Sequence, residues 1–241
     1  MSKTDQVYAT PREQVDAFTF NDQVADVFDN MISRSVPGYQ LMLDMIGILT
    51  DRYAQAGSRC YDLGCSLGAS TLKIRHHLPA DCHIVAVDNS EAMVKRCQGN
   101  LERDHSAATV EVRLADLRKV NIEDASVVVM NFTLQFVADE DRPALLKRIC
   151  DGLRPGGILI LAEKIRYENE TVQDLLTDLH HDFKRTNGYS DLEIAQKRTA
   201  LENVLVPNTD DEHLKRLQDA GFSSVTQCIR CLNFASYLAI K

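Results

Sequence analysis

The residues best suited to chemistry form a loop, Asp62-Leu63-Gly64-Cys65-Ser66-Leu67-Gly68, between an apolar run and a helical segment. Open α/β sheets bind ligands at the carboxyl ends of their strands, where this loop would lie. Gly64 lets the backbone approach a ligand without a Cβ clash, and Gly68 lets the following helix pack closely. The small residues Gly64, Ser66 and Gly68 are spaced more tightly than the G-x-G-x-x-G of dinucleotide sites. With Asp62 at the strand end to attract an ammonium or sulfonium, the loop favours S-adenosylmethionine (SAM), although alone it also fits an ordinary strand-to-helix turn.

Polar residues at the ends of three further strands complete this pattern. Asp88 follows the second strand, roughly 20 residues on, where an acid accepts both ribose hydroxyls of a nucleoside. The same position, with Asn89, also fits a helix cap. Asp116 follows the third strand, beside the expected adenine amino group, and Asn131 ends the fourth, toward the amino-acid and sulfonium end of the ligand. Together, these positions predict SAM binding.

The elements that must position these residues alternate between strand and helix. Strands are predicted at residues 59–63, 83–88, 109–114, 125–132 and 157–163, with helices at 70–77, 90–101 and 140–153. This alternation predicts an α/β fold, a Rossmann-like SAM-binding fold with a mostly parallel sheet and helices on both faces. Two closing strands, 224–231 and 234–240, are joined by Leu232-Asn233 and predict a C-terminal antiparallel hairpin.

Two helical segments lie outside this alternation. One helix begins at Asn21 and keeps a helical period as far as Ile32; after Pro37-Gly38, a second runs from Tyr39 to Tyr53. Residues 168–203 form a helical insertion before the last two strands, with a capping box at Ser190-x-x-Glu193. We interpret residues 1–56 as an N-terminal helical segment covering the site and 57–241 as the SAM-binding domain, together one structural domain. A further helix is predicted near residues 211–220, ending at Gly221.

Composition narrows the class of partner. The 241 residues suit one α/β domain, and 27 Lys and Arg against 35 Asp and Glu give a formal charge of -8. Because phosphate neutralisation supplies most nucleic-acid affinity, we expect a small-molecule substrate and no direct nucleic-acid binding. No apolar stretch approaches the roughly 20 residues of a membrane span. The polar N-terminus and seven scattered cysteines predict a cytoplasmic protein with reduced thiols.

Cys228 and Cys231 form a C-x-x-C motif that deserves comparison with metal and redox sites. They fall in a predicted strand, where residues three apart face opposite sides of the sheet. No second Cys or His pair stands at zinc-finger spacing. We therefore predict no metal at this motif or elsewhere.

A closer resemblance covers nearly the whole chain. It rests on segments that include the SAM loop, the end of the fourth strand and much of the helical insertion. These segments are residues 34–39 (RSVPGY), 61–69 (YDLGCSLGA), 131–136 (NFTLQF), 181–185 (HDFKR), 187–190 (NGYS), 196–198 (QKR) and 201–204 (LENV). In them, the chain resembles the carboxy-S-adenosyl-L-methionine (carboxy-SAM) synthase family.

The resemblance implies that SAM is carboxylated on its sulfonium methyl rather than used as a methyl donor. Prephenate would supply the carbon dioxide, giving carboxy-SAM and phenylpyruvate. The product would pass to a tRNA-modifying enzyme that builds a carboxymethoxy group on wobble uridine, and the protein would be a homodimer. The residues implied to contact cofactor or product are Tyr39, Gly64, Cys65, Ser66, Asp88, Asn89, Asp116, Leu117, Asn131 and Arg198.

A basic cluster in this acidic protein lies on the helical insertion: Lys184, Arg185, Lys197 and Arg198. Each also fits a solvated helix face. For Arg198, the resemblance favours a carboxylate clamp, because a planar guanidinium binds a carboxylate through two parallel hydrogen bonds.

The proton acceptor of such a reaction is not evident. Carboxylation requires loss of a proton from the carbon beside the sulfonium, and no residue stands out as the base. His180 and His181 are candidates, but adjacent histidines on a helix face different ways. Water or hydroxide released as prephenate aromatises is the other acceptor, which leaves the protein to hold the reactants close and dry.

Two other functions keep the same fold and loop. One is a conventional SAM-dependent methyltransferase acting on a small molecule, and the other is a non-catalytic SAM-binding subunit. Formation of S-adenosylhomocysteine from SAM and an acceptor would support the first, and binding without turnover the second.

Overall fold

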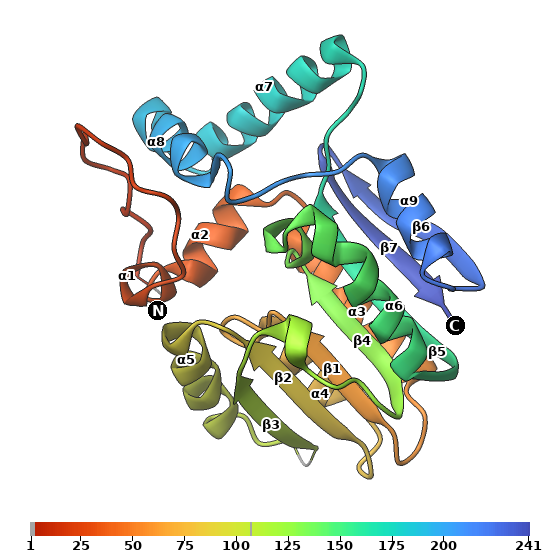
Figure 1. Cartoon of the computed structure of the whole chain (residues 1–241). Helices are drawn as coiled ribbons and strands as arrows, with labels where there is room; N and C mark the ends of the chain where they lie inside the picture. Colours follow the sequence, from red (N-terminus) through yellow and green to blue (C-terminus); the bar gives the residue numbers. More distant parts are fainter. Residues whose placement is uncertain (1–2, 107) are drawn as a thin grey trace.

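A seven-stranded sheet organises the protein, seen in a computed structural model that describes residues 3–106 and 108–241. The strand order is β3-β2-β1-β4-β5-β7-β6 (Figure 1). The strands are β1 (Arg59–Leu63), β2 (His83–Asp88), β3 (Thr109–Leu114), β4 (Ala125–Asn131), β5 (Leu153–Lys164), β6 (Ser224–Cys231) and β7 (Phe234–Ile240). β1 to β5 are mutually parallel, and β7 runs antiparallel between β5 and β6. The predicted mostly parallel sheet with an antiparallel C-terminal hairpin is confirmed.

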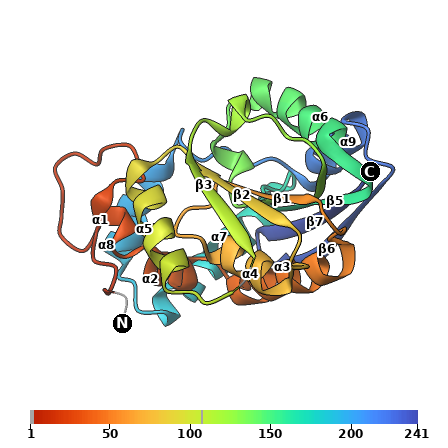
Figure 2. The same ribbon diagram turned by 90° about the horizontal axis from the view of Figure 1, so that it is seen from below.

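Helices cover both faces of the sheet. They are α1 (Asp22–Ala25), α2 (Phe28–Ser35), α3 (Tyr39–Tyr53), α4 (Ala69–His77), α5 (Glu91–Glu102), α6 (Arg142–Gly152), α7 (Glu170–Thr186), α8 (Asp191–Leu201) and α9 (Asp210–Asp219), with short 3₁₀ turns η1 (Leu117–Lys119), η2 (Leu134–Phe136) and η3 (Asp139–Asp141). Seen along the sheet, α3 and α4 lie on one side and α6 and α9 on the other (Figure 2). Figure 1 shows α7 and α8 beyond the carboxyl ends of the parallel strands.

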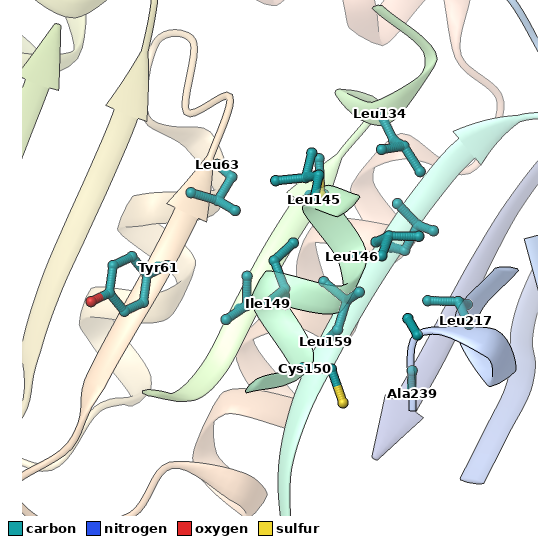
Figure 3. Packing of buried hydrophobic residues seen from close by; sticks show 14 of the residues in the cluster. Tyr61, Leu63, Leu134, Leu145, Leu146, Ile149, Cys150, Leu159, Leu217 and Ala239 are labelled. Carbon is teal, nitrogen blue, oxygen red and sulfur yellow. The ribbon is translucent and has the colours of Figure 1, made fainter. Parts of the chain in front are cut away.

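The core follows from the two-residue period of buried strands. Tyr61 and Leu63 of β1 point toward α6, where they join Leu146 and Ile149 (Figure 3). Cys60, the residue before Tyr61, belongs to the opposite layer, formed with α3 and α4. With both faces covered, the central strands are continuous apolar runs, as parallel sheets require.

Two predicted elements differ in the structure. The helix expected from Asn21 to Ile32 is broken at Val27, giving α1 and α2, because α1 packs on α5 while α2 packs against α3 and α7. Strand β5 begins at Leu153, earlier than the predicted residue 157. A register shift in the pairing with β4 separates its first residues from the rest, so Pro155 and Gly156 lie inside the strand and not before it.

The N-terminal segment and the insertion pack against each other. Gln196 of α8 donates from Nε2 to the Tyr8 carbonyl at 2.8 Å, and the Phe18 amide donates to the Ala200 carbonyl at 2.8 Å. The predicted capping box is present, with both the Ser190 and the Glu193 contacts formed. Across the part of the chain that the structure describes, no helix is long and apolar enough to span a membrane.

Candidate active site

A cavity of about 460 Å³ opens at the carboxyl ends of the parallel strands. Ligand pockets commonly measure about 300–1,000 Å³, so it has room for a nucleoside-sized ligand and a second small molecule. Nine of the ten residues predicted to contact the ligand line it. They are Tyr39, Gly64, Cys65, Ser66, Asp88, Asn89, Asp116, Leu117 and Asn131. The exception is Arg198, which is exposed on α8 and is not part of the cavity wall.

The glycines of the loop allow close packing around the site. Gly64 has φ +85°, and its amide donates to the Val87 carbonyl at 2.8 Å. A Cβ at Gly64 would overlap the Thr133 side chain, which also lines the cavity. At Gly68, a Cβ would stand 2.8 Å from Cys97 Sγ, so this glycine allows close packing of α5 as well as the start of α4.

Asp88 holds the loop and the start of α5 together. Its carboxylate accepts from the backbone amides of Ser66 and Ser90, each at 2.9 Å. Asp88 therefore forms the helix-cap contact that the sequence also allowed, and it lines the cavity as well. Burial raises the pKa of Asp88 above its usual range. Each carboxylate oxygen accepts one amide and keeps a second lone pair, so both still have capacity for ribose hydroxyls.

Asp62 does not meet the expectation of a carboxylate that faces the ligand. It is fully buried behind the cavity wall, accepts from Thr71 Oγ1 at 2.6 Å, and its Oδ1 has no hydrogen-bond partner. Burial, together with the charge of Asp88, raises its pKa to about 7.

Asn131 supplies the polar group that Asp62 does not. Its amide donates to Ser70 Oγ at 3.2 Å, while its buried Oδ1 has no partner and the residue lines the cavity. An unsatisfied buried acceptor is costly, and an ammonium donor relieves that cost. This acceptor and the close-approach geometry at Gly64 both fit the amino-acid end of SAM.

The adenine end is predicted at Asp116. Asp116 accepts from the Arg118 amide at 2.9 Å and pairs with the Arg118 guanidinium, which also binds Asp141. The Arg118 side chain lowers the pKa of Asp116, so the carboxylate is ionised and ready to accept from an amino group.

Aromatic residues of the N-terminal segment close one side of the cavity. Phe20 packs edge-on against Phe18 at 5.1 Å and against Phe136 at 5.2 Å between ring centroids, and Phe28 lies beside it. All four rings line the cavity. Sequence reasoning missed Phe18 and Phe20, because residues before Asn21 have no secondary-structure period to reveal which way they face.

The part of the cavity lined by β5, α7 and α8, called the basic end below, carries three lysines. Lys184 and Lys197, predicted as part of the basic cluster, line it together with Lys164 from the end of β5, which sequence reasoning missed. Arg185 lies outside the cavity and pairs with Asp182 at 2.7 Å and Asp191 at 2.8 Å, as the solvated-face alternative predicted. Exposed Arg198 adds positive potential, since it lowers the pKa of Lys164 and Lys184.

His180 and His181 face different ways, as expected for neighbours on a helix. His180 is buried, lines the cavity and contacts the Ser35 carbonyl through Nε2 at 2.8 Å. Because a carbonyl can only accept, that nitrogen carries a proton. Burial lowers the His180 pKa to about 3, so the ring is neutral at physiological pH. His181 is half-buried and lies outside the cavity wall.

The C-x-x-C motif lies in β6, away from this cavity. Cys228 is exposed and Cys231 half-buried, on opposite sides of the strand, and both are free thiols. Among the residues described, no group of three or more His, Cys, Asp or Glu side chains is arranged to hold a metal.

Fold and site together define a SAM-dependent methyltransferase fold. A family profile described as "Methyltransferase domain" matches residues 61–157. The structure is similar in fold to human N-acetylserotonin methyltransferase in complex with SAM, with a TM-score of 0.62, 18% identity, and coverage of 91% of this chain and 55% of that one.

Full-length relatives narrow the class to one family. The chain is 56% identical to the carboxy-SAM synthase of Geobacter sp. (strain M21), over 99% of both sequences. It is 53% identical to the carboxy-SAM synthase of Aliivibrio fischeri (strain MJ11), over 100% of both. The chain belongs to the carboxy-S-adenosyl-L-methionine synthase family. The resemblance found in the sequence is confirmed, and with it the prediction of a transferase that uses SAM.

Proposed function

We propose that the protein carboxylates the sulfonium methyl of SAM with the carboxyl group of prephenate, giving carboxy-SAM, phenylpyruvate and water. The observation that supports this most strongly is the single cavity, which joins a SAM-type end at the strand termini to a basic end between β5, α7 and α8. A methyl acceptor of ordinary polarity has no need of the basic end, whereas a carboxylated substrate does.

We assign the SAM end to the residues predicted for it. Gly64, Cys65 and Ser66 would lie against the amino acid and ribose, with the Asn131 oxygen accepting from the ammonium. Asp88 and Asn89 would bind the ribose hydroxyls, Asp116 and Leu117 would contact the adenine, and Tyr39 would lie beside the sulfonium. Residues 1–56 and 168–203 would act as the cover that excludes water from the reaction.

For proton transfer, we propose that the protein relies on its substrate. His180 is neutral, but its Nε2 is committed to the Ser35 carbonyl and its low pKa makes it a poor base. Prephenate releases hydroxide as it loses carbon dioxide and aromatises. This hydroxide can accept the proton from the SAM methyl group and become water. The chain then contributes proximity and a closed cavity.

The test of this function is the mass of the nucleoside formed by the purified protein. With SAM and prephenate, we expect a product heavier than SAM by one carbon dioxide, together with phenylpyruvate. S-adenosylhomocysteine formed with an acceptor would instead identify a conventional methyltransferase, and binding of SAM without any turnover would identify a SAM-binding subunit.

We keep Arg198 as the proposed clamp on the new carboxylate, and a homodimer as the proposed assembly. Because Arg198 is exposed in the single chain, it can serve the cavity only after a side-chain movement or when a neighbouring chain completes the site. The Arg198→Ala variant should lose affinity for carboxy-SAM about 10- to 150-fold more than for SAM, as expected for a lost charge-assisted pair.

Calorimetry with both ligands measures this difference. Arg198→Lys should recover part of the loss, since an ammonium keeps the charge but not the planar fork. Equal weakening of both ligands would assign Arg198 a structural role, and no weakening would leave it on the solvated face.

We further propose that the product is passed to an enzyme that modifies the tRNA wobble uridine, and that this occurs in the cytoplasm. The seven free thiols support a reducing compartment. The formal charge of -8 supports transfer of a small molecule, and not of tRNA, between the two proteins.

A further inference from the structure

Three amines meet at the basic end of the cavity from three separate elements. Lys164 ends β5, Lys184 belongs to the last turn of α7, and Lys197 lies within α8. Lys197 is 7% exposed and donates to Ser35 Oγ at 3.0 Å. Within the described residues, none of the three amines forms an ion pair with a carboxylate, and those of Lys164 and Lys184 have no hydrogen-bond partner in the chain.

The charges around these amines are mostly positive. Burial, followed by the charges of Lys197, Lys164 and Arg198 in that order, lowers the pKa of Lys184 to about 7. Burial lowers the pKa of Lys197 to about 8, where the charge of Asp5 gives only a smaller opposing effect. Glu163, next to Lys164, directs its carboxylate away to the amides of Leu134 and Gln135. Lys197 is buried, whereas Lys164 and Lys184 are half-buried. Like charges that share one cavity with limited access to water destabilise one another unless an anion joins them.

The neighbouring wall is aromatic. Phe132 and Phe234 line the cavity with their ring centroids 5.9 Å apart, and Phe234 packs edge-on against His180 at 5.0 Å. Tyr39 lies beyond, 6.3 Å from Phe132. Phe132 is held in this wall with φ +61°, a conformation that bulky residues rarely adopt. An apolar ring that carries more than one carboxylate matches both this wall and the amines.

We propose that Lys164, Lys184 and Lys197 form an anion site for a cyclic dicarboxylate, the second substrate, with its ring against Phe132 and Phe234. This inference rests on the proposed function and identifies the residues that would select its carboxyl donor. Ammonium groups bind as separate point charges, so three of them on separate elements suit two separated carboxylates better than one compact anion.

Binding at this site should be linked to proton uptake. The groups facing Lys184 are Lys164 of β5, His180 and His181 of α7, and Lys197 and Arg198 of α8. Among them, His180 is neutral, and the lysines and arginine carry positive charge when protonated. A bound carboxylate favours the charged amines and raises their pKa. Affinity should therefore be full below about pH 7 and fall as the pH rises above the pKa of Lys184.

The experiment measures prephenate binding by calorimetry to protein loaded with S-adenosylhomocysteine, which lacks the methyl group and cannot react. Lys164→Met and Lys184→Met should each weaken prephenate about 10- to 150-fold, the loss expected for one charged hydrogen bond, and leave S-adenosylhomocysteine binding unchanged. Arg185→Met, a basic residue next to Lys184 but outside the cavity, is the control and should bind both ligands normally. The pH dependence of binding from 7 to 9 should be reduced in Lys184→Met.

2-Phenylglutarate, an unreactive aromatic compound with two separated carboxylates, separates this inference from the proposed function. If the wild type does not convert prephenate but binds 2-phenylglutarate in a lysine-dependent way, the function fails and the anion site stands. If neither dicarboxylate depends on the lysines, the anion site is wrong even where turnover occurs. If the lysine variants lose as much affinity for S-adenosylhomocysteine as for prephenate, the lysines have a structural role. If inorganic phosphate binds as tightly as the dicarboxylates, the proposed ligand class is wrong.

Discussion

Gly64→Ala is expected to lower SAM affinity by at least about 30-fold while the sheet stays folded. The φ of +85° at this position costs an L residue about 1–2 kcal/mol. The new Cβ also overlaps the Thr133 side chain, and overpacking of this kind costs about 1–3 kcal/mol. Together the two effects give about 2–5 kcal/mol against the loop conformation that lines the cavity. Calorimetry measures the loss of SAM affinity, and thermal unfolding of the same preparation measures whether the fold is retained.

Gly99→Ala is the matched control. Gly99 lies within helix α5, and a Cβ there would meet nothing within 4 Å. Replacing a mid-helix glycine by alanine stabilises a helix by about 0.5–1 kcal/mol, so this variant should unfold at a slightly higher temperature and bind SAM normally. If Gly64→Ala also bound SAM normally, the loop would not need the conformation seen here.

The residues proposed to bind SAM could be placed around one cavity from the sequence because they occupy strand ends. Once the apolar runs around Gly64, Asp88, Asp116 and Asn131 are recognised as parallel strands, topology alone brings their last residues to one edge. No side-chain detail is needed for that step. The prediction for Asp62 was wrong because alternation along a strand does not show whether a side chain near its end turns toward the ligand, and Thr71 of α4 holds this one inward.

The basic end could be predicted only in part. Lys184 and Lys197 drew attention because they cluster in sequence, but Arg185, in the same cluster, points to solvent and pairs with Asp182. Lys164 stands alone in the sequence and reaches the cavity only because β5 ends beside α7. The three lysines lie at one cavity because of the way the helical insertion packs on the sheet. The spacing of apolar residues along the sequence does not predict that packing.

Asp88→Ala is expected to reduce SAM affinity about 100- to 1,000-fold, because the carboxylate has two tasks at once. It accepts the amides of Ser66 and Ser90, and hydrogen bonds to a charged group contribute about 1.5–3 kcal/mol each. It is also the proposed acceptor for the ribose hydroxyls, so its removal leaves donors of both protein and ligand unpaired. Asp88→Asn keeps one acceptor oxygen and should show an intermediate loss. Asp44→Ala, which removes an exposed carboxylate paired with Lys73, is the control and should bind SAM normally.

The pH dependence of the wild type gives an independent check of this assignment. Burial raises the pKa of Asp88, so on acidification this carboxylate takes up its proton at a higher pH than an ordinary aspartate. A protonated carboxyl keeps less capacity to accept from Ser66, Ser90 and the ribose, and SAM affinity should fall as the pH drops through the raised pKa. Asp88→Asn, which cannot titrate, should lose this dependence. If SAM affinity is unchanged in Asp88→Ala, or if Asp88→Asn keeps the acid dependence of the wild type, the carboxylate is a cap of α5 alone and the ribose is held elsewhere.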